Sequence, residues 1–333
     1  MKILLLGLSE AATGNATTLR RIAGHLHAAG HQTVFRAIET LEEEAMLETA
    51  RKEQCDAALG IHAYGAGKFL RHLEIPTVII FGGTDLNDVI HDDAKKTVMT
   101  EAVEHAAALV CFNEDFMNRA QALWPQVKTK LHLIPQSVSV TPSQFSKTSI
   151  VALPADAIVY LLPAGLREMK DPLFLGNAIA AWHKKDPRIH LLIAGAQRDI
   201  SFAASVRETV RALPGVILVD PLPQPDLWAL MSQSEVVLNT SHSECSPNSL
   251  LEAMALGVPV LARDIPGNRA IVSDGKTGML FATPNAFIAK AMNLHSDHAL
   301  RERVIAGAHT MIRTAFSPER EANAYAELFA KLS

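Results

Sequence analysis

Residues 239–260 read NTSHSECSPNSLLEAMALGVPV, and this stretch decides the fold. It predicts a strand end, a polar loop, a helix and the next strand, which is the repeating unit of a parallel α/β sheet. Ser246 is expected to cap the helix, with Pro247 at its first position, where a missing N–H costs nothing. Gly257 is expected to end the helix before Pro259.

Two carboxylates flank the start of this helix. Glu244 lies in the preceding loop, and Glu252 lies inside the helix on its polar face, four residues after Asn248. Because the first N–H groups of a helix have no intrahelical acceptor, Ser246 to Ser249 are expected to bind an anion. A phosphate-linked, hydroxyl-rich ligand such as a sugar nucleotide would suit this arrangement. A capped helix with two glutamates also occurs in α/β domains that bind no such ligand.

The composition sets limits on domain count and partners. The chain has 333 residues, of which 48% are apolar, so it is long enough for two domains of ordinary size. A formal net charge of −4 and 5% aromatic residues argue against a nucleic-acid partner. Phosphate recognition must therefore be local, whereas peripheral membrane contact and the oligomeric state stay open.

The cysteines and the apolar runs indicate the compartment. Cys55, Cys111 and Cys245 are scattered and have no metal-ligand spacing, which favours a reducing, cytoplasmic location. The first apolar run is too short for a signal peptide, and no run is long enough to span a bilayer.

Apolar runs alternate with helical patterns and predict two doubly wound parallel sheets. Strands of the first half are expected at residues 3–8, 34–38, 57–61, 77–81, 109–112 and 131–134. Strands of the second half are expected at residues 158–162, 189–194, 216–219, 236–239 and 258–262. A polar stretch at residues 137–154 predicts a linker. The expected domains are 1–150 and 151–315, with a C-terminal helical segment, 316–333, packed back on the first domain.

Loops at the carboxyl ends of the first-half strands supply further candidates, because ligands bind at that edge of a parallel sheet. Gly14 and Asn15 open the first helix, where glycine lets the backbone approach a ligand. His62 follows the third strand and either faces the ligand or binds only local backbone. Thr84 and Asp85 end the next strand and either line the same rim or form a tight turn with Asp85 as a cap.

The turn after the first strand of the second half is basic. It contains Gly165, Arg167 and Lys170, whose charges suit a diphosphate. The alternative is a solvated turn before a helix capped by Asp171. The sequence contains neither a P-loop nor a serine-hydrolase elbow, and Cys245 lacks an evident histidine base.

The order of these segments resembles the retaining glycosyltransferases of family 4 over nearly the whole chain. That family has the GT-B fold, in which two Rossmann-like, doubly wound domains face each other across a cleft. The resemblance rests on Glu244 with Glu252 in Glu-Ala-Met, on the His62 loop, and on Gly165 with Lys170. Within the family, the chain is most similar to the glycosyltransferase 1 domain-containing group, through residues 80–85, 170–173 and 260–268.

The resemblance implies a nucleoside-diphosphate sugar as co-substrate, no metal or other cofactor, and retention at the anomeric carbon. It implies that Glu244 orients the donor sugar, that Glu252 binds the ribose, and that Lys170 and Arg167 stabilise the leaving diphosphate. It also implies that His62 approaches the sugar from the first domain. We therefore expect a hexosyltransferase-type enzyme with an undetermined acceptor. A glycoside hydrolase, a sugar-nucleotide epimerase or hydrolase on the same fold, and a non-catalytic sugar-nucleotide-binding protein are the alternatives.

Overall fold

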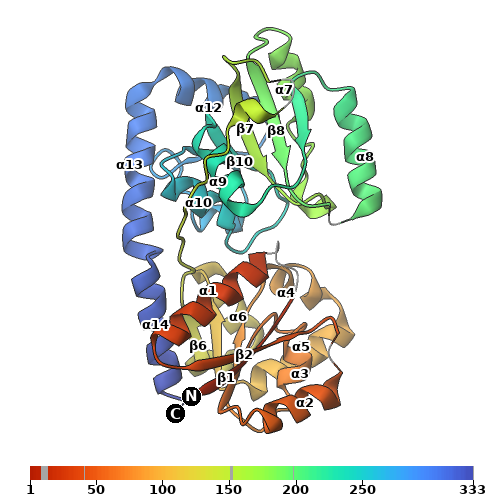
Figure 1. The fold of residues 1–333 in the computed structure, drawn as a ribbon, viewed down its shortest axis with the longest axis vertical. Helices are drawn as coiled ribbons and strands as arrows, with labels where there is room; N and C mark the ends of the chain where they lie inside the picture. Colours follow the sequence, from red (N-terminus) through yellow and green to blue (C-terminus); the bar gives the residue numbers. More distant parts are fainter. Residues whose placement is uncertain (9–13, 41, 151–152, 198, 333) are drawn as a thin grey trace. The chain divides into compact units, whose positions relative to one another are not determined.

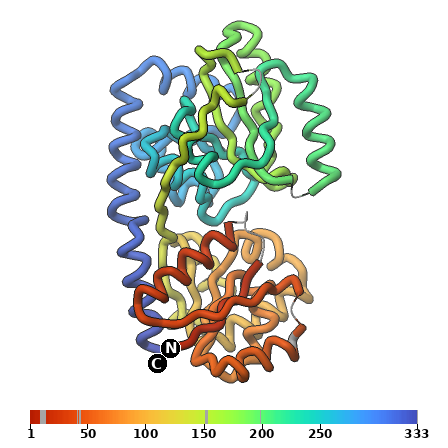
Figure 2. Tube along the Cα trace, viewed as in Figure 1, coloured from red at the N-terminus to blue at the C-terminus, as the bar shows by residue number. Residues whose placement is uncertain are grey.

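The computed structural model describes residues 1–8, 14–40, 42–150, 153–197 and 199–332. The chain forms two compact units (Figures 1 and 2). Unit 1 comprises Met1–Ser137 and Phe316–Ser333, so it holds both chain ends, and unit 2 comprises Val138–Ala315.

The boundary between the units lies earlier than the predicted one after residue 150. The segment that follows Val138 belongs to unit 2 because its polar groups bind there. The Ser143 N–H donates to the Pro225 carbonyl at 3.0 Å, and the Ser143 hydroxyl donates to Asp226 at 2.5 Å. Hydrogen bonds thus attach the predicted linker to one domain.

In unit 1 the described strands form a parallel sheet in the order β2-β1-β3-β4-β5-β6. The strands are β1 Lys2–Gly7, β2 Gln32–Ala37, β3 Ala57–Ile61, β4 Thr77–Ile80, β5 Ala108–Cys111 and β6 Leu131–Leu133. The helices are α1 Gly14–Ala28, α2 Glu43–Lys52, α3 Gly67–Leu70, α4 Gly83–Asn87, α5 Asp93–His105, α6 Glu114–Leu123 and α14 Pro318–Ala330. The central strands are buried on both faces, as their continuous apolar sequences require.

Helix α14 lies beside α1 in unit 1 (Figure 1). Its Glu321 side chain is fully buried, forms an ion pair with Arg21 of α1 at 2.7 Å and accepts a hydrogen bond from His25 Nε2 at 3.0 Å. The Ser137 N–H and hydroxyl donate to the same carboxylate at 3.1 and 2.5 Å. One carboxylate therefore holds α14, α1 and the last residue before the chain enters unit 2.

In unit 2 the described strands form a second parallel sheet, in the order β12-β11-β10-β7-β8-β9. The strands are β7 Ile158–Pro163, β8 Ile189–Ala194, β9 Val216–Val219, β10 Val236–Asn239, β11 Val260–Arg263 and β12 Met279–Phe281. The helices are α7 Gly176–His183, α8 Ile200–Arg211, α9 Gln224–Ser232, α10 Asn248–Ala255, α11 Pro266–Arg269, α12 Pro284–Ser296 and α13 His298–Ala315. Aromatic side chains fill the core, where Phe287 meets Tyr160 and Phe281 edge to face with ring centroids 5.7 and 5.4 Å apart.

Two predicted helix starts were wrong. Helix α7 begins at Gly176 and not at Pro172, because Asp171 adopts a left-handed conformation (φ 40°) and tight i→i+3 turns follow it. Helix α10 begins at Asn248, and its N-cap is Pro247 and not Ser246, because the Pro247 carbonyl accepts the first hydrogen bond of the helix, from Leu250 N–H at 3.1 Å.

Candidate functional site

The strongest candidate residues of unit 2 come together at one edge of its sheet. Lys170 ends a short 3₁₀ turn, Glu168–Lys170, which follows β7, and Glu244 lies in the loop after β10. Strands β7 and β10 are parallel neighbours, so their carboxyl ends meet at the same edge. There the Lys170 ammonium group forms an ion pair with Oε1 of Glu244.

The Glu244 carboxylate is held entirely through one oxygen. Besides Lys170, the Asn239 amide donates to Oε1 at 3.0 Å and the Ser241 hydroxyl donates to it at 2.6 Å. Within the ranges that the structure describes, no group donates to Oε2. The side chain is 11% exposed. One oxygen is thus fixed in place, and the other keeps its capacity to accept a hydrogen bond from a ligand hydroxyl.

Glu244 is ionised at neutral pH. Burial by itself raises the pKa of this carboxyl group, but the charge of Lys170 and the hydrogen bonds from Lys170, Ser241 and Asn239 outweigh burial and lower the pKa below its ordinary value. The site therefore presents a buried negative charge beside a positive one.

The loop after β11 packs directly against the backbone of Glu244. A Cβ atom at Gly267 would lie 2.1 Å from the Glu244 carbonyl oxygen, so only glycine fits there without displacing the loop. The next residue, Asn268, is fully buried and its amide donates to Oδ1 of Asn239 at 3.1 Å. Asn268 thus orients the side chain that in turn donates to Glu244.

Helix α10 carries the second glutamate. Glu252 is 9% exposed, and its Oε2 accepts from the Gln224 side chain of α9 at 3.2 Å. At the helix start, Asn248, Ser249 and the preceding Ser246 are partly buried. The helix ends at Ala255, and Gly257 (φ 74°) turns the chain after it, where Val258 N–H donates to the Ala253 carbonyl at 2.9 Å.

Arg167 does not join the Lys170–Glu244 pair. Its side chain is exposed, and in the described part of the chain it has no hydrogen-bond or ion-pair partner. Gly165 is partly buried where β7 and β8 approach closely, since a Cβ atom at Gly195 would lie 2.1 Å from the Ala164 carbonyl oxygen.

In unit 1 the predicted residues surround His62. The Asn15 amide Nδ2 donates to His62 Nε2 at 2.7 Å, and His62 Nδ1 lies 3.4 Å from both Thr84 Oγ1 and Asp85 Oδ1. The ring lies against Gly82, where a Cβ atom would come within 2.1 Å of it. His62 also has φ 80°, an uncommon value for a residue other than glycine.

Asp85 does not line an open rim, because its side chain is fully buried. Its Oδ2 accepts from Ala63 N–H and Gly82 N–H, each at 2.8 Å. Asp85 therefore holds together the loops after β3 and β4. Its contacts match the predicted alternative in which Asp85 caps a tight turn, and not the one in which it lines the rim. Thr84 is partly buried beside the His62 ring, and Gly14 is exposed at the start of α1.

The comparison with known proteins places the chain in a family. It is 38% identical over 339 residues to glycosyltransferase 1 domain-containing protein 1 of Xenopus tropicalis, a match that covers 100% of this chain and 98% of that one. The chain belongs to this glycosyltransferase family. Residues 156–297 also match the family described as glycosyl transferases group 1. A D-inositol 3-phosphate glycosyltransferase of Thermomonospora curvata is 30% identical over 175 residues, or 49% of this chain and 41% of that one.

Solved structures show that this glycosyltransferase has the GT-B fold. Sucrose-phosphate synthase of Thermosynechococcus elongatus superposes with a TM-score of 0.82 at 18% identity, covering 100% of this chain and 99% of the other. HepE of Anabaena, in complex with UDP and glucose, superposes with a TM-score of 0.80 at 15% identity, covering 99% and 100%. The two parallel sheets predicted from the sequence are thus confirmed.

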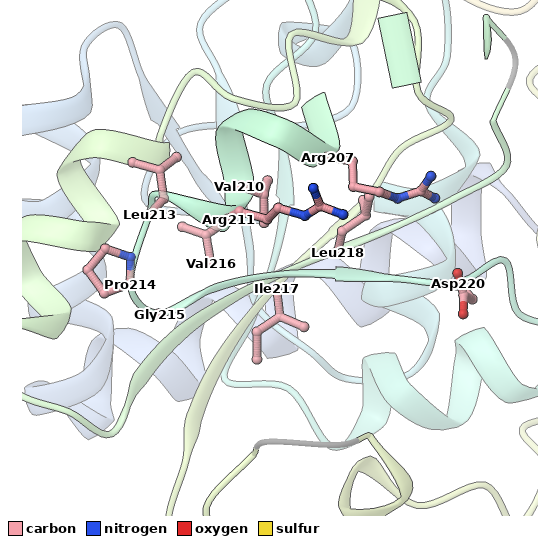
Figure 3. Close-up of a pocket in the computed structure, with 10 residues that line it drawn as sticks. All are labelled: Arg207, Val210, Arg211, Leu213, Pro214, Gly215, Val216, Ile217, Leu218 and Asp220. Atoms are coloured by element: carbon pink, nitrogen blue, oxygen red, sulfur yellow. The ribbon is translucent and has the colours of Figure 1, made fainter. Parts of the chain in front are cut away.

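A cavity of the glycosyltransferase lies apart from these residues. It has a volume of about 440 Å³ and lies between the end of α8 and strand β9, with Arg207, Arg211 and Asp220 at its polar side (Figure 3). None of the predicted site residues lines it. In the described ranges, no group of three or more acidic, histidine or cysteine side chains could hold a metal ion, and no helix is both long and apolar enough to cross a membrane.

Sequence reasoning missed the residues that support the candidate site. Asn239 and Ser241 hold Glu244, and Asn268 holds Asn239. The available signal was the run of polar residues directly after an apolar strand, since such residues are buried only when they are hydrogen-bonded.

Proposed function

We propose that the protein transfers a hexose from a nucleoside-diphosphate sugar to an acceptor, with retention at the anomeric carbon and without a catalytic metal. The observation that carries this proposal is the Glu244 carboxylate, which is fixed through Oε1 and leaves Oε2 to accept from a sugar hydroxyl. Membership of a glycosyltransferase family supports it.

The charged groups of unit 2 have separate proposed roles. Lys170 and the N–H groups at the start of α10 stabilise the charge that develops on the leaving diphosphate, and Arg167 is recruited from the surface for the same purpose. Glu252 accepts from the ribose hydroxyls. In unit 1, His62 is oriented by Asn15 and Asp85 to hydrogen-bond with the substrate.

Because side chains and a helix start supply the positive charge, we expect activity to survive chelation. Turnover should stay within about twofold after treatment with EDTA. Loss of turnover that added Mg²⁺ or Mn²⁺ restores would contradict the metal-independent part of the proposal.

The two glutamates allow a direct test of the donor site. Glu252→Gln removes a charge that strengthens hydrogen bonds from ribose, so it should weaken bare nucleotide and sugar nucleotide alike, by about 1–2 kcal/mol. Glu244→Gln should leave nucleotide affinity nearly unchanged and lower turnover of the sugar donor. Calorimetry with nucleotide and kinetics with donor measure both effects, and Glu168→Gln, an exposed glutamate in the same unit, is the matched control. Equal loss of nucleotide affinity in both variants would refute the division of roles.

The donor itself is found by a thermal-shift screen, because a ligand that binds only the folded state raises its stability. UDP-glucose is the first compound to test, since HepE has been solved with it. Product analysis by NMR then distinguishes the possible reactions. These are transfer with retention or with inversion at the anomeric carbon, isomerisation of the donor sugar, release of free sugar, and binding without reaction. We also propose a cytoplasmic location, supported by three buried cysteines that are not in disulfides and tested by cell fractionation.

A further inference from the structure

We infer that Arg263 is a positioning residue that keeps Lys170 available to the Glu244 site, an inference that rests on the proposed function. Arg263 ends strand β11, and its Nη1 donates to Asp171 Oδ2 at 2.9 Å. The same nitrogen donates to the Thr240 carbonyl at 3.2 Å. Asp171 directly follows Lys170, and Thr240 lies in the loop that leads to Glu244. One guanidinium group therefore binds both segments that carry the ion pair.

The backbone joins the same two segments. The Thr240 hydroxyl donates to the Lys170 carbonyl at 3.0 Å, and the His242 N–H donates to the Met169 carbonyl at 2.9 Å. These bonds hold the turn after β7 against the loop after β10. Arg263, at the end of the neighbouring strand β11, bonds to both segments through its side chain.

The proposed role of Arg263 depends on its ion pair with the Asp171 carboxylate. Without a partner, this carboxylate would compete with Glu244 for the neighbouring Lys170 ammonium group. Arg263 neutralises it in an ion pair whose side chains are 21% and 25% exposed. The His242 Nε2 atom also lies near Asp171 Oδ2, at 3.4 Å, but Arg263 Nη1 is closer, at 2.9 Å. Arg263 thus leaves Lys170 for Glu244 and for the leaving group.

The Arg263 side chain is held in a single place. Its guanidinium carbon lies 4.2 Å from the centroid of the Phe174 ring, which is a cation–π contact. Asp171 itself has φ 40°, a conformation that residues other than glycine adopt rarely and that surrounding contacts must maintain. The Phe174 contact and the hydrogen bonds to Asp171 and Thr240 together fix the guanidinium group beside the turn that carries Lys170.

A double-mutant cycle with Lys170 tests this inference. In the otherwise unchanged protein, Arg263→Ala should lower kcat about tenfold, because misplacing one catalytic group by a fraction of an ångström has effects of this order. In the Lys170→Ala background the same change should lower kcat by less than about twofold. Arg263→Lys keeps the charge that neutralises Asp171 but loses the planar contact with Phe174, so it should recover only part of the activity.

Two kinetic outcomes would overturn the inference. A tenfold loss in both backgrounds would mean that Arg263 acts independently of Lys170. Unchanged kcat per folded molecule, with only a lower melting temperature, would mean that Arg263 merely stabilises unit 2. The matched control is Arg269→Ala, which removes an exposed arginine that pairs with Asp264 at 2.6 Å in the same loop region, and it should leave kcat unchanged.

Hydrogen exchange gives a readout that does not depend on activity. In Arg263→Ala the amide of His242 should exchange at least about tenfold faster, because its hydrogen bond to Met169 is no longer supported, while Arg269→Ala should leave it unchanged. Unchanged exchange in Arg263→Ala would overturn the inference even if every sugar nucleotide proved inactive. Faster exchange without any transferase activity would uphold the positioning role and refute the proposed function.

Discussion

Replacing Glu321 by glutamine should destabilise unit 1 strongly. The Glu321 side chain is fully buried and accepts from Arg21, His25 and Ser137. Glutamine has nearly the same shape but no charge, so it would leave the Arg21 guanidinium, which is 17% exposed, without a compensating carboxylate. Removing one partner of a buried ion pair costs about 3–5 kcal/mol.

The pKa of Glu321 gives a second measure of the same interaction. Burial alone raises this pKa, but the hydrogen bond from His25 and the charge of Arg21 more than offset burial and lower the pKa from 4.5 to about 2. At about 1.4 kcal/mol per unit of pKa, the ionised carboxylate contributes about 3 kcal/mol. Because the folded-state pKa is depressed, this stability is present above pH 4.5 and is lost as the pH falls towards 2.

The assay is urea unfolding of the full chain, followed by the fluorescence of Trp124. This residue is buried in unit 1, and replacing Trp182 and Trp228 of unit 2 by phenylalanine makes the signal specific. At pH 7 we expect Glu321→Gln to lower the free energy of unfolding of unit 1 by about 3 kcal/mol. The difference from the parent protein should shrink by about 1 kcal/mol at pH 4 and about 2 kcal/mol at pH 3.

The control for this experiment is Glu327→Gln, which changes an exposed glutamate on the same helix and should alter stability by less than about 0.5 kcal/mol. If Glu321→Gln matches this control, or if the difference between Glu321→Gln and the parent stays constant from pH 7 to pH 3, the reasoning about the buried carboxylate is refuted.

Three further substitutions test the close packing at two glycines and the cost of one buried hydroxyl group. Gly267→Ala should lower donor turnover at least about tenfold with little change in global stability, because the new Cβ atom would lie 2.1 Å from the Glu244 carbonyl oxygen and displace that loop. Gly82→Ala should likewise lower turnover, since its Cβ atom would come within 2.1 Å of the His62 ring; kinetics measure both effects. Tyr325→Phe should leave unit 1 equally stable or stabilise it by up to about 1 kcal/mol in urea unfolding, because the buried Tyr325 hydroxyl has no partner in the described structure.

Gly24→Ala is the control for the two glycine substitutions, because a Cβ atom there meets nothing within 4 Å and alanine favours the helix. Turnover equal to that of Gly24→Ala in either variant would show that the neighbouring loop adjusts freely. A loss of more than 1 kcal/mol in Tyr325→Phe would reveal a hydrogen bond that the described contacts do not include.

The sheets were predictable because strands buried on both faces have continuous apolar sequences. Strands β3, β8, β9 and β10 begin and end at the predicted residues. Strand β12, Met279–Phe281, was missed. Helix α13 was missed although its buried residues recur every four positions, at Leu300, Val304, Ala308 and Ile312, which is a helical signal.

The candidate site was predictable only in part. That Lys170 and Glu244 lie at the carboxyl ends of strands follows from the sequence, but their ion pair depends on β10 lying next to β7, and strand order cannot be deduced from local patterns. Sequence proximity also favoured Arg167 as the second basic residue. The arginine that binds this turn is Arg263, 92 positions from its partner Asp171, and only tertiary structure brings the two together.

The contact between Ser137 and Glu321 has a consequence for how the polypeptide is divided. Unit 2 is one uninterrupted stretch inserted into unit 1, and the two ends of the host lie side by side where Ser137 donates to Glu321. A short peptide that joins Ser137 to Phe316 in place of unit 2 would therefore close unit 1 at a small cost in loop-closure entropy. Because the inserted stretch has its own sheet and its own hydrophobic core, its loops can change without altering the core of unit 1.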